Sequence, residues 1–321
     1  MPADLPATPT VSRRGFVTAT AASLAAGAFV SASSGSRAAE TPSEPFRYCF
    51  NTSTIRGQKL GIVKEIELVA KAGYHGIEPW IDELDEYVKA GGSLADLKKR
   101  IADHGLTVES AIGFAAFLHE DAAERQKGLE DAKRCMGLVR DIGGTRIAAP
   151  PVGVTDRTGL DLFQLATRFR ALVELGRQEG VLPQLELWGF AKTLSHLGEV
   201  AFLAAESGEA DALCLLDVYH IYKGGSAFGG LGMFPGSRMK CFHVNDYPAD
   251  PARDAIKDEH RVYPGDGVAP LDEIFQTLRH NSFQGVLSLE LFNRTYWQQD
   301  AYEVVKTGLE KTRAAVAKAF G

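Results

Sequence analysis

The chain has 321 residues, of which 45% are hydrophobic and 24% are charged, so it can bury one large core or two small ones. Its formal net charge is −6, and it contains no basic run. These properties argue against a nucleic-acid partner bound through phosphates. They favour a small substrate that is neutral or held by a metal.

The first 39 residues differ in composition from the rest of the chain. The sequence Ser-Arg-Arg-Gly-Phe-Val at 12–17 precedes a weakly apolar, Ala-rich stretch that ends at Ala38 and Ala39. This pattern predicts a twin-arginine export signal over residues 1–39 and a mature domain over residues 40–321. We therefore expect a periplasmic or otherwise exported protein with no membrane segment in its mature form. A membrane anchor or a disordered tail is the alternative, which the shortness of the run disfavours.

Short β-rich runs alternate with amphipathic helical stretches from residue 46 to the C-terminus. The apolar residues of the helical stretches recur at the spacing of one helix face. The predicted strands cover 46–51, 76–80, 107–113, 146–150, 183–188, 212–218, 240–246 and 285–291. The predicted helices cover 60–72, 124–142, 160–178, 194–207, 271–279 and 302–320.

This alternation predicts an α/β fold, a single-domain (β/α)8 TIM barrel. An open doubly wound sheet is the alternative, but no G-x-G-x-x-G phosphate turn follows the run 46–51. Along the run 285–291, Glu290 alternates with Leu289 and Leu291. Because strand side chains alternate in direction, the leucines should face the helices and the glutamate the barrel mouth.

The four cysteines are scattered, without a C-x-x-C motif. Cys49, Cys214 and Cys241 fall within predicted strands, where a free thiol behaves as a small hydrophobic side chain. We therefore expect free cysteines. A disulfide between Cys214 and Cys241 is the alternative.

A carboxylate or an imidazole ends each of four consecutive apolar runs. These residues, called here the strand-end quartet, are Glu186, Asp217, His243 and Glu290. Charged groups at buried strand ends are costly unless compensated, so four in succession predict one metal site. The donors suit Mn²⁺ or Mg²⁺ best, with Co²⁺, Fe²⁺ or Zn²⁺ as further candidates. Taken singly, each residue could instead cap a turn, pack as a core histidine or pair with an arginine.

Three side chains near the quartet are candidates for substrate binding. His220 follows Asp217 by three residues and could reach a substrate oxygen, unless it is a surface-loop histidine. Arg261 lies in a long polar loop, where a solvated position is equally compatible. Trp188 could stack on a sugar ring, although core packing also explains an aromatic residue near a strand end. The same holds for the other aromatic residues near strand ends, Trp80, Phe114 and Trp297.

Several motifs together resemble one family. They are the strand-end quartet, the D-x-x-H of 217–220, the H-V-N-D of 243–246 and the R-x-x-x-G-D-G of 261–267. This set resembles the xylose isomerase-like barrels, the sugar phosphate isomerase/epimerase family that includes D-tagatose 3-epimerase, hydroxypyruvate isomerase and inosose dehydratase. The resemblance covers about residues 46–318 and implies one divalent metal ion.

The resemblance also implies roles for individual residues. Glu186 and Glu290 would bind the metal and exchange a proton with the sugar carbon. Asp217 and His243 would be ligands only, and His220 would hold a substrate oxygen. The segment LWGFAKTL after Glu186 departs from the epimerases, because it lacks their asparagine and second acidic residue.

We therefore expect a metal-dependent isomerase or epimerase that removes a proton beside the carbonyl of a ketose or keto-sugar. Export disfavours a phosphorylated sugar, so the expected partner is a free small-molecule sugar. Loss of a β-oxygen from the same enediolate gives the alternative, a lyase or dehydratase acting on a keto-sugar, 3-keto-glycoside or inosose. An endonuclease IV-type phosphodiesterase is disfavoured, because eight histidines are few for several zinc ions. A catalytically inactive periplasmic sugar-binding barrel is the non-enzyme alternative, and a homo-oligomer is left open.

Overall fold

Parallel strands form the centre of the fold in the computed structural model, which describes residues 44–321. The export signal expected over residues 1–39 lies outside the described residues. The strands are β1 (Arg47–Asn51), β2 (Gly76–Glu78), β3 (Thr107–Val108), β4 (Arg146–Ala149), β5 (Leu182–Glu186), β6 (Leu213–Asp217), β7 (Met239–Val244) and β8 (Val286–Leu289). Each overlaps one of the predicted strands.

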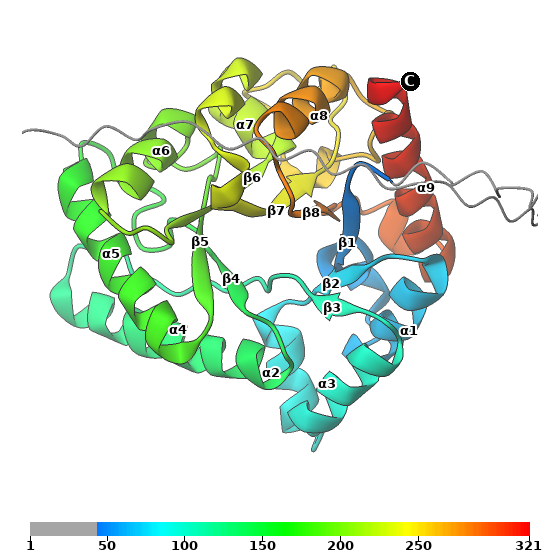
Figure 1. Ribbon diagram of the computed structural model, residues 1–321, viewed down its shortest axis with the longest axis horizontal. Helices are drawn as coiled ribbons and strands as arrows, with labels where there is room; N and C mark the ends of the chain where they lie inside the picture. The colour runs from blue at the N-terminus through cyan, green and yellow to red at the C-terminus, as the bar shows by residue number, and fades with distance from the viewer. Residues whose placement is uncertain (1–43) are drawn as a thin grey trace, which may run out of the picture. The chain divides into compact units, whose positions relative to one another are not determined.

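The strand order is β3-β2-β1-β8-β7-β6-β5-β4, and hydrogen-bonded neighbours are parallel. Just beyond β3, the carbonyl of Ala111 accepts a hydrogen bond from the N–H of Ala148 in β4 (2.8 Å), which brings the two ends of the sheet together. The strands thus curl around a common centre with the helices outside them (Figure 1). The predicted single-domain TIM barrel is confirmed.

Six helices of the described residues lie where the sequence predicts them. They are α1 (Ile62–Ala72), α4 (Ala122–Asp141), α5 (Leu162–Glu179), α6 (Leu197–Glu206), α8 (Leu271–His280) and α9 (Ala301–Phe320). Aspartates start α4, α5 and α9, because the side chains of Asp121, Asp161 and Asp300 accept hydrogen bonds from first-turn N–H groups. Within residues 44–321, no helix combines the length and the hydropathy that a membrane crossing requires.

The helix ranges given from the sequence do not include α2 (Ile81–Lys89), α3 (Leu94–Asp103) or α7 (Val218–Gly224). Only two side chains in each of α2 and α3 are buried, so their apolar stripes are narrow. Short 3-10 turns complete the described chain: η1 (Thr52–Gln58), η2 (Phe228–Met233), η3 (Gly236–Arg238), η4 (Asp258–His260) and η5 (Tyr296–Gln298).

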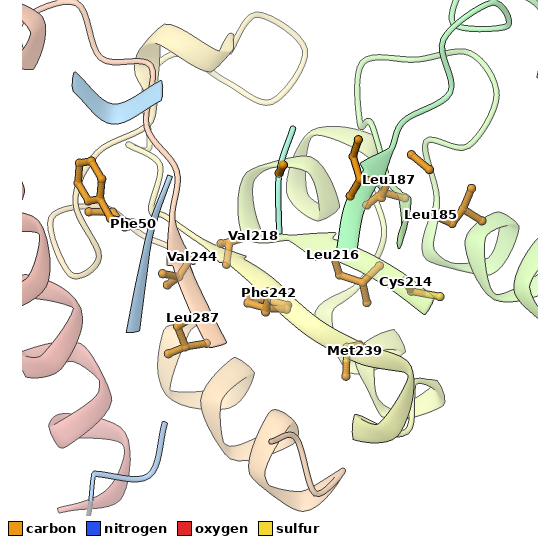
Figure 2. Packing of buried hydrophobic residues seen from close by; sticks show 14 of the residues in the cluster. Phe50, Leu185, Leu187, Cys214, Leu216, Val218, Met239, Phe242, Val244 and Leu287 are labelled. Carbon is orange, nitrogen blue, oxygen red and sulfur yellow. The ribbon is translucent and has the colours of Figure 1, made fainter. Parts of the chain in front are cut away.

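The core explains why the strand-end quartet faces the barrel axis. Figure 2 shows buried side chains that neighbour quartet residues in sequence: Leu185 and Leu187 beside Glu186, Leu216 and Val218 beside Asp217, and Phe242 and Val244 beside His243. These apolar side chains belong to the large core cluster that includes the helices. Because successive strand side chains point to opposite faces, packing the apolar neighbours outward directs the quartet inward.

All four cysteines are free and buried, as predicted. Cys241 belongs to a small cluster with Cys49, Leu215 and Val286, whereas Cys214 belongs to the large cluster. The two strands thus present these thiols to different packing layers, which is why the alternative Cys214–Cys241 disulfide does not form.

Candidate metal centre and substrate cleft

Three quartet residues converge at the carboxyl ends of the strands. Asp217, His243 and Glu290 each offer one donor atom, and these atoms lie within 4.8 Å of one another. His243 Nδ1 lies 3.1 Å from a carboxylate oxygen of Glu290 and 3.8 Å from Oδ2 of Asp217. All three residues are buried. Their strands bring together side chains that are up to 73 positions apart in the chain, here Asp217 and Glu290.

Glu186, the fourth member, ends β5 and lies outside this three-residue group. Its side chain is buried, and Oε2 has no hydrogen-bond partner among the described residues. Burial raises the pKa of Glu186 to about 8, since the opposing effect of His243 is outweighed by burial and by the negative charges of Glu290, Asp217 and Glu78. This carboxyl group can therefore hold or release a proton near neutral pH.

Asp217 caps a helix and faces the site at the same time. Its Oδ1 accepts a hydrogen bond from the N–H of His220 (2.7 Å) and so starts α7. Its Oδ2 accepts hydrogen bonds from Asn245 (2.8 Å) and Arg261 (3.0 Å). Asp217 can therefore cap α7 with one carboxylate oxygen and face the site with the other. The turn-capping alternative and the predicted place at the site are thus compatible.

His220 is buried beside the quartet rather than exposed in a surface loop. Its Nδ1 accepts a hydrogen bond from the N–H of Gly189 (3.3 Å), and its Nε2 lies 3.1 Å from the guanidinium of Arg261. Burial and the charge of Arg261 lower the pKa of His220 to about 4, although Asp217 opposes them. His220 is therefore a neutral imidazole at physiological pH.

Arg261 is also buried, which excludes the solvated alternative. One guanidinium nitrogen donates hydrogen bonds to Asp217 (3.0 Å) and to Glu290 (2.8 Å), and the other donates to Asp258 (2.5 Å). Burial opposes the positive charge, but the neighbouring carboxylates outweigh it and raise the pKa of Arg261. The ring of Tyr219 lies 4.5 Å from the guanidinium carbon.

Asp246 fixes the loop that carries Arg261. Its carboxylate accepts hydrogen bonds from the N–H groups of Gly265 (3.0 Å), Gly267 (3.1 Å) and Ala269 (2.9 Å). A Cβ at Gly267 would collide with Asp246 and with the carbonyl of Tyr247, so this close approach requires glycine. The H-V-N-D and R-x-x-x-G-D-G motifs therefore act as one structural unit.

A cleft of about 220 Å³ opens above these residues. Its polar lining consists of Glu186, His220, Asp258, Arg261 and Glu290. Its aromatic lining consists of Trp80, Phe114, Trp188, Phe190 and Phe292, and Phe114 and Phe190 remain about half exposed. Polar groups below an aromatic rim suit a ring that carries hydroxyl groups.

Trp297 does not line this cleft, unlike the other aromatic residues singled out in the sequence. Its indole N–H donates a hydrogen bond to the carbonyl of Ser53 (3.1 Å), and its Cβ packs against Gly57. The packing alternative therefore holds for Trp297. Asp258, Phe190 and Phe292 line the cleft but were not predicted from the sequence.

Glu78 is a further buried carboxylate that sequence reasoning missed. It ends β2 and accepts hydrogen bonds from Asn51 (2.9 Å) and Ser288 (2.7 Å), while His243 Nε2 lies 3.0 Å away. Burial alone would raise its pKa, but His243 and these hydrogen bonds lower it to about 2. The sequence does contain a signal for Glu78, because the segment GIEPW at 76–80 is another short apolar run that reaches a carboxylate.

The quartet fits a divalent cation by its chemistry. Glu186 Oε2 is buried and has no hydrogen-bond partner among residues 44–321, and His243 Nδ1 makes no hydrogen bond of acceptable geometry, although it lies 3.1 Å from Glu290. Buried polar atoms are rarely left unpaired, and these belong to a set of carboxylate and imidazole donors. A bound cation would give both atoms a partner.

Comparison with known proteins gives a consistent picture. Residues 66–315 match the family described as xylose isomerase-like TIM barrel. The inosose isomerase of Bacillus velezensis is 29% identical over 279 residues, which cover 85% of this chain and 98% of that protein. The 3-dehydroshikimate dehydratase of Pseudomonas aeruginosa is 25% identical over 235 residues, or 72% of this chain and 36% of that protein.

A solved structure shares the architecture. The crystal structure of an IolI protein with a bound zinc atom superposes with a TM-score of 0.78 at 25% identity, covering 86% of this chain and 99% of the other. These relatives have names of isomerases and dehydratases, so the family contains enzymes. Because the family match spans most of the barrel, the chain belongs to the xylose isomerase-like TIM barrel family.

Proposed function

We propose that this protein is a divalent-metal-dependent sugar isomerase or epimerase. It moves a proton beside the carbonyl of a non-phosphorylated ketose or keto-sugar. One observation carries the proposal: two buried carboxyl groups, Glu186 and Glu290, line a single aromatic-rimmed cleft together with His220 and Arg261. The similarity to an inosose isomerase supports the same reaction class.

The strand-end quartet would hold the metal ion. When bound, a divalent ion polarises the substrate carbonyl and makes the neighbouring C–H more acidic. Mn²⁺ and Mg²⁺ suit the three carboxylates, and the relative with bound zinc supports Zn²⁺ as a further candidate.

The protein's own side chains then transfer the proton and hold the substrate. One of Glu186 and Glu290 removes the carbon-bound proton, and the other delivers a proton to the opposite face or to the adjacent carbon. Neutral His220 hydrogen-bonds to a substrate oxygen, and Arg261 adds positive charge beside Glu290. Trp188 and its aromatic neighbours stack on the sugar ring and exclude water.

A dehydratase is the second candidate, favoured by the similarity to 3-dehydroshikimate dehydratase. The first step is the same proton removal. The second carboxyl group, in its protonated form, would then protonate a departing β-oxygen, which leaves as water. A lyase acting on a 3-keto-glycoside would differ only in the group attached to that oxygen.

The reaction classes can be separated by incubating metal-loaded protein with ketoses, inososes and 3-keto-glycosides in D₂O. NMR and mass spectrometry should show deuterium beside the carbonyl with the carbon skeleton and all oxygens retained. Loss of water would instead identify the dehydratase, and release of the aglycone the lyase. Sugar binding without exchange or elimination would identify an inactive binding barrel.

We also propose that the protein acts after export. The twin-arginine pattern at Arg13 and Arg14 supports this location, and a free sugar is the substrate expected outside the cytoplasm.

A further inference from the structure

The imidazole of His243 is held from both sides. Its Nε2 lies 3.0 Å from Oε2 of Glu78, whereas its Nδ1 faces the carboxylates of Glu290 and Asp217. The side chains of His243 and Glu78 are fully buried. Only one ring nitrogen therefore faces the quartet, and the opposite nitrogen faces Glu78.

Glu78 is itself held by donors from other strands. Its Oε2 also accepts hydrogen bonds from Ser288 in β8 (2.7 Å) and Asn51 in β1 (2.9 Å). An oxygen with three such partners, His243, Ser288 and Asn51, has a fixed position. Glu78 thus presents a stationary carboxylate oxygen to His243.

Asn51 extends this arrangement to a second quartet residue. Its side-chain NH₂ donates hydrogen bonds both to Glu78 (2.9 Å) and to Oε1 of Glu290 (3.1 Å). Its Oδ1 accepts the indole N–H of Trp80 (2.8 Å), which lines the cleft. The side-chain amide of Asn51 therefore connects Glu78 both to Glu290, a predicted ligand, and to Trp80 at the aromatic rim.

We propose that Glu78 is a positioning residue of the metal centre. It keeps the Nε2 proton of His243 on its own side, so that the Nδ1 lone pair faces Asp217 and Glu290, and through Asn51 it fixes Glu290. The inference rests on the proposed function, in which the quartet holds a divalent ion. Carboxylates that accept the second N–H of a ligating histidine typically contribute about 10–100-fold to metal affinity or activity.

A second metal ion is the competing explanation, because Glu78, Cys241 and His243 also offer donor atoms within 4.8 Å of one another. The contacts favour a positioning role for Glu78 over a second metal site. The Glu78 oxygen that faces His243 already accepts hydrogen bonds from Asn51 and Ser288, and the thiol of Cys241 lies 3.6 Å from the other oxygen.

The test compares Glu78→Gln with Glu109→Gln. Glu109 is a matched control, since it is a buried barrel carboxylate that pairs with Arg47 (2.7 Å) and Arg146 (3.1 Å) instead of His243. Affinity for Mn²⁺ and Zn²⁺ is measured by competition with a chromophoric chelator, and stoichiometry by elemental analysis. We expect Glu78→Gln to bind each ion about 10–100-fold more weakly, and Glu109→Gln to retain wild-type affinity.

Ser288→Ala provides a milder variant that removes one donor to Glu78 but keeps its charge. It should weaken metal binding in the same direction and to a smaller extent, even if Glu78→Gln fails to fold. With saturating metal, substrate turnover by Glu78→Gln should show a lower kcat and a KM close to that of the wild type.

The possible results separate this inference from the proposed function. Wild-type protein that binds no divalent ion overturns both. If the wild type binds metal and Glu78→Gln and Ser288→Ala bind it with unchanged affinity, only the positioning role is overturned. The positioning role is also overturned if Glu109→Gln loses as much metal affinity as Glu78→Gln does. Two equivalents of metal in the wild type and one in Cys241→Ser would show that Glu78 belongs to a second metal site.

Discussion

Arg261 and Glu290 lie 2.8 Å apart at the floor of the cleft, and the same guanidinium nitrogen lies 3.0 Å from Asp217. A single buried cation thus touches two of the residues that we propose as metal ligands. Arg261 offsets part of the negative charge that the carboxylates concentrate there. The stability of the metal-free protein should therefore depend on Arg261.

We therefore predict that Arg261→Met destabilises the metal-free protein more than the metal-loaded protein. Removing one partner of a buried ion pair leaves an uncompensated charge and typically costs about 3–5 kcal/mol. Thermal unfolding with chelator and with saturating Mn²⁺ measures the difference, and the Tm gained on adding metal should be larger in the variant than in the wild type. Equal gains would show that Arg261 does not compensate the ligand charges.

Asp217→Ala should lower the metal content of the purified protein sharply, because it removes a carboxylate from the quartet. The variant also loses the cap of α7, which typically costs about 0.5–2 kcal/mol. Asp161→Ala is the matched control, since Asp161 caps α5 and is not in the quartet. Elemental analysis should find full metal in Asp161→Ala and little in Asp217→Ala. Full stoichiometry in Asp217→Ala would contradict the assignment of this ligand.

The sequence predicted the barrel because its signal is local. Each strand is a short apolar run, and the alternation of Glu290 with Leu289 and Leu291 already indicates which side faces the barrel axis. The quartet followed from the same rule, since the carboxyl ends of parallel strands meet at one mouth. Glu78 obeys this rule as well, but its run is only three residues long in the structure and was not recognised as part of the site.

Other features depend on contacts between distant segments and could not be predicted. Trp188 lines the cleft and Trp297 does not, although both lie near predicted strand ends. The difference arises because Trp297 packs against Gly57, far away in the chain. In the same way, the burial of Arg261 depends on the hydrogen bonds that Asp246 accepts from its loop.

Glu290→Gln should bind metal but lose C–H exchange of the substrate in D₂O. The amide keeps an oxygen donor, yet it cannot accept the carbon-bound proton as a carboxylate does. His220→Ala should retain exchange at saturating substrate and show a raised KM, because His220 is proposed to hold a substrate oxygen. NMR-detected deuterium uptake measures both effects. Undiminished exchange in metal-loaded Glu290→Gln would assign the proton transfer to another group.

Replacing Arg13 and Arg14 with lysine should leave the precursor in the cytoplasm. The twin-arginine route requires the arginine pair, while a Lys pair keeps the charge of the segment. Cell fractionation with immunoblotting measures the distribution, and the retained protein should keep wild-type metal binding. Normal appearance of the double variant in the periplasm would rule out this export route.

Glu65, in α1 and remote from the quartet in sequence, should make stability fall as pH rises. Burial, together with the charge of Glu83, raises its pKa from 4.5 to about 9, and Arg56 only partly opposes this. The folded protein therefore holds this proton more tightly than the unfolded chain does. Between pH 4.5 and about 9, unfolding releases the proton, so the stability that is fully present below pH 4.5 is progressively lost.

Glu65→Gln should remove this dependence, because glutamine resembles the protonated carboxyl group but cannot ionise. Wild-type stability should decline by up to about 1.4 kcal/mol per pH unit from this group, while the variant follows a flatter curve and has the higher Tm at pH 8. Glu67→Gln is the control on the same helix, since Glu67 pairs with Lys64 at the surface and its pKa is lowered. Urea unfolding from pH 5 to 8 compares the three proteins. Parallel curves for wild type and Glu65→Gln would show that Glu65 is already ionised in the folded protein.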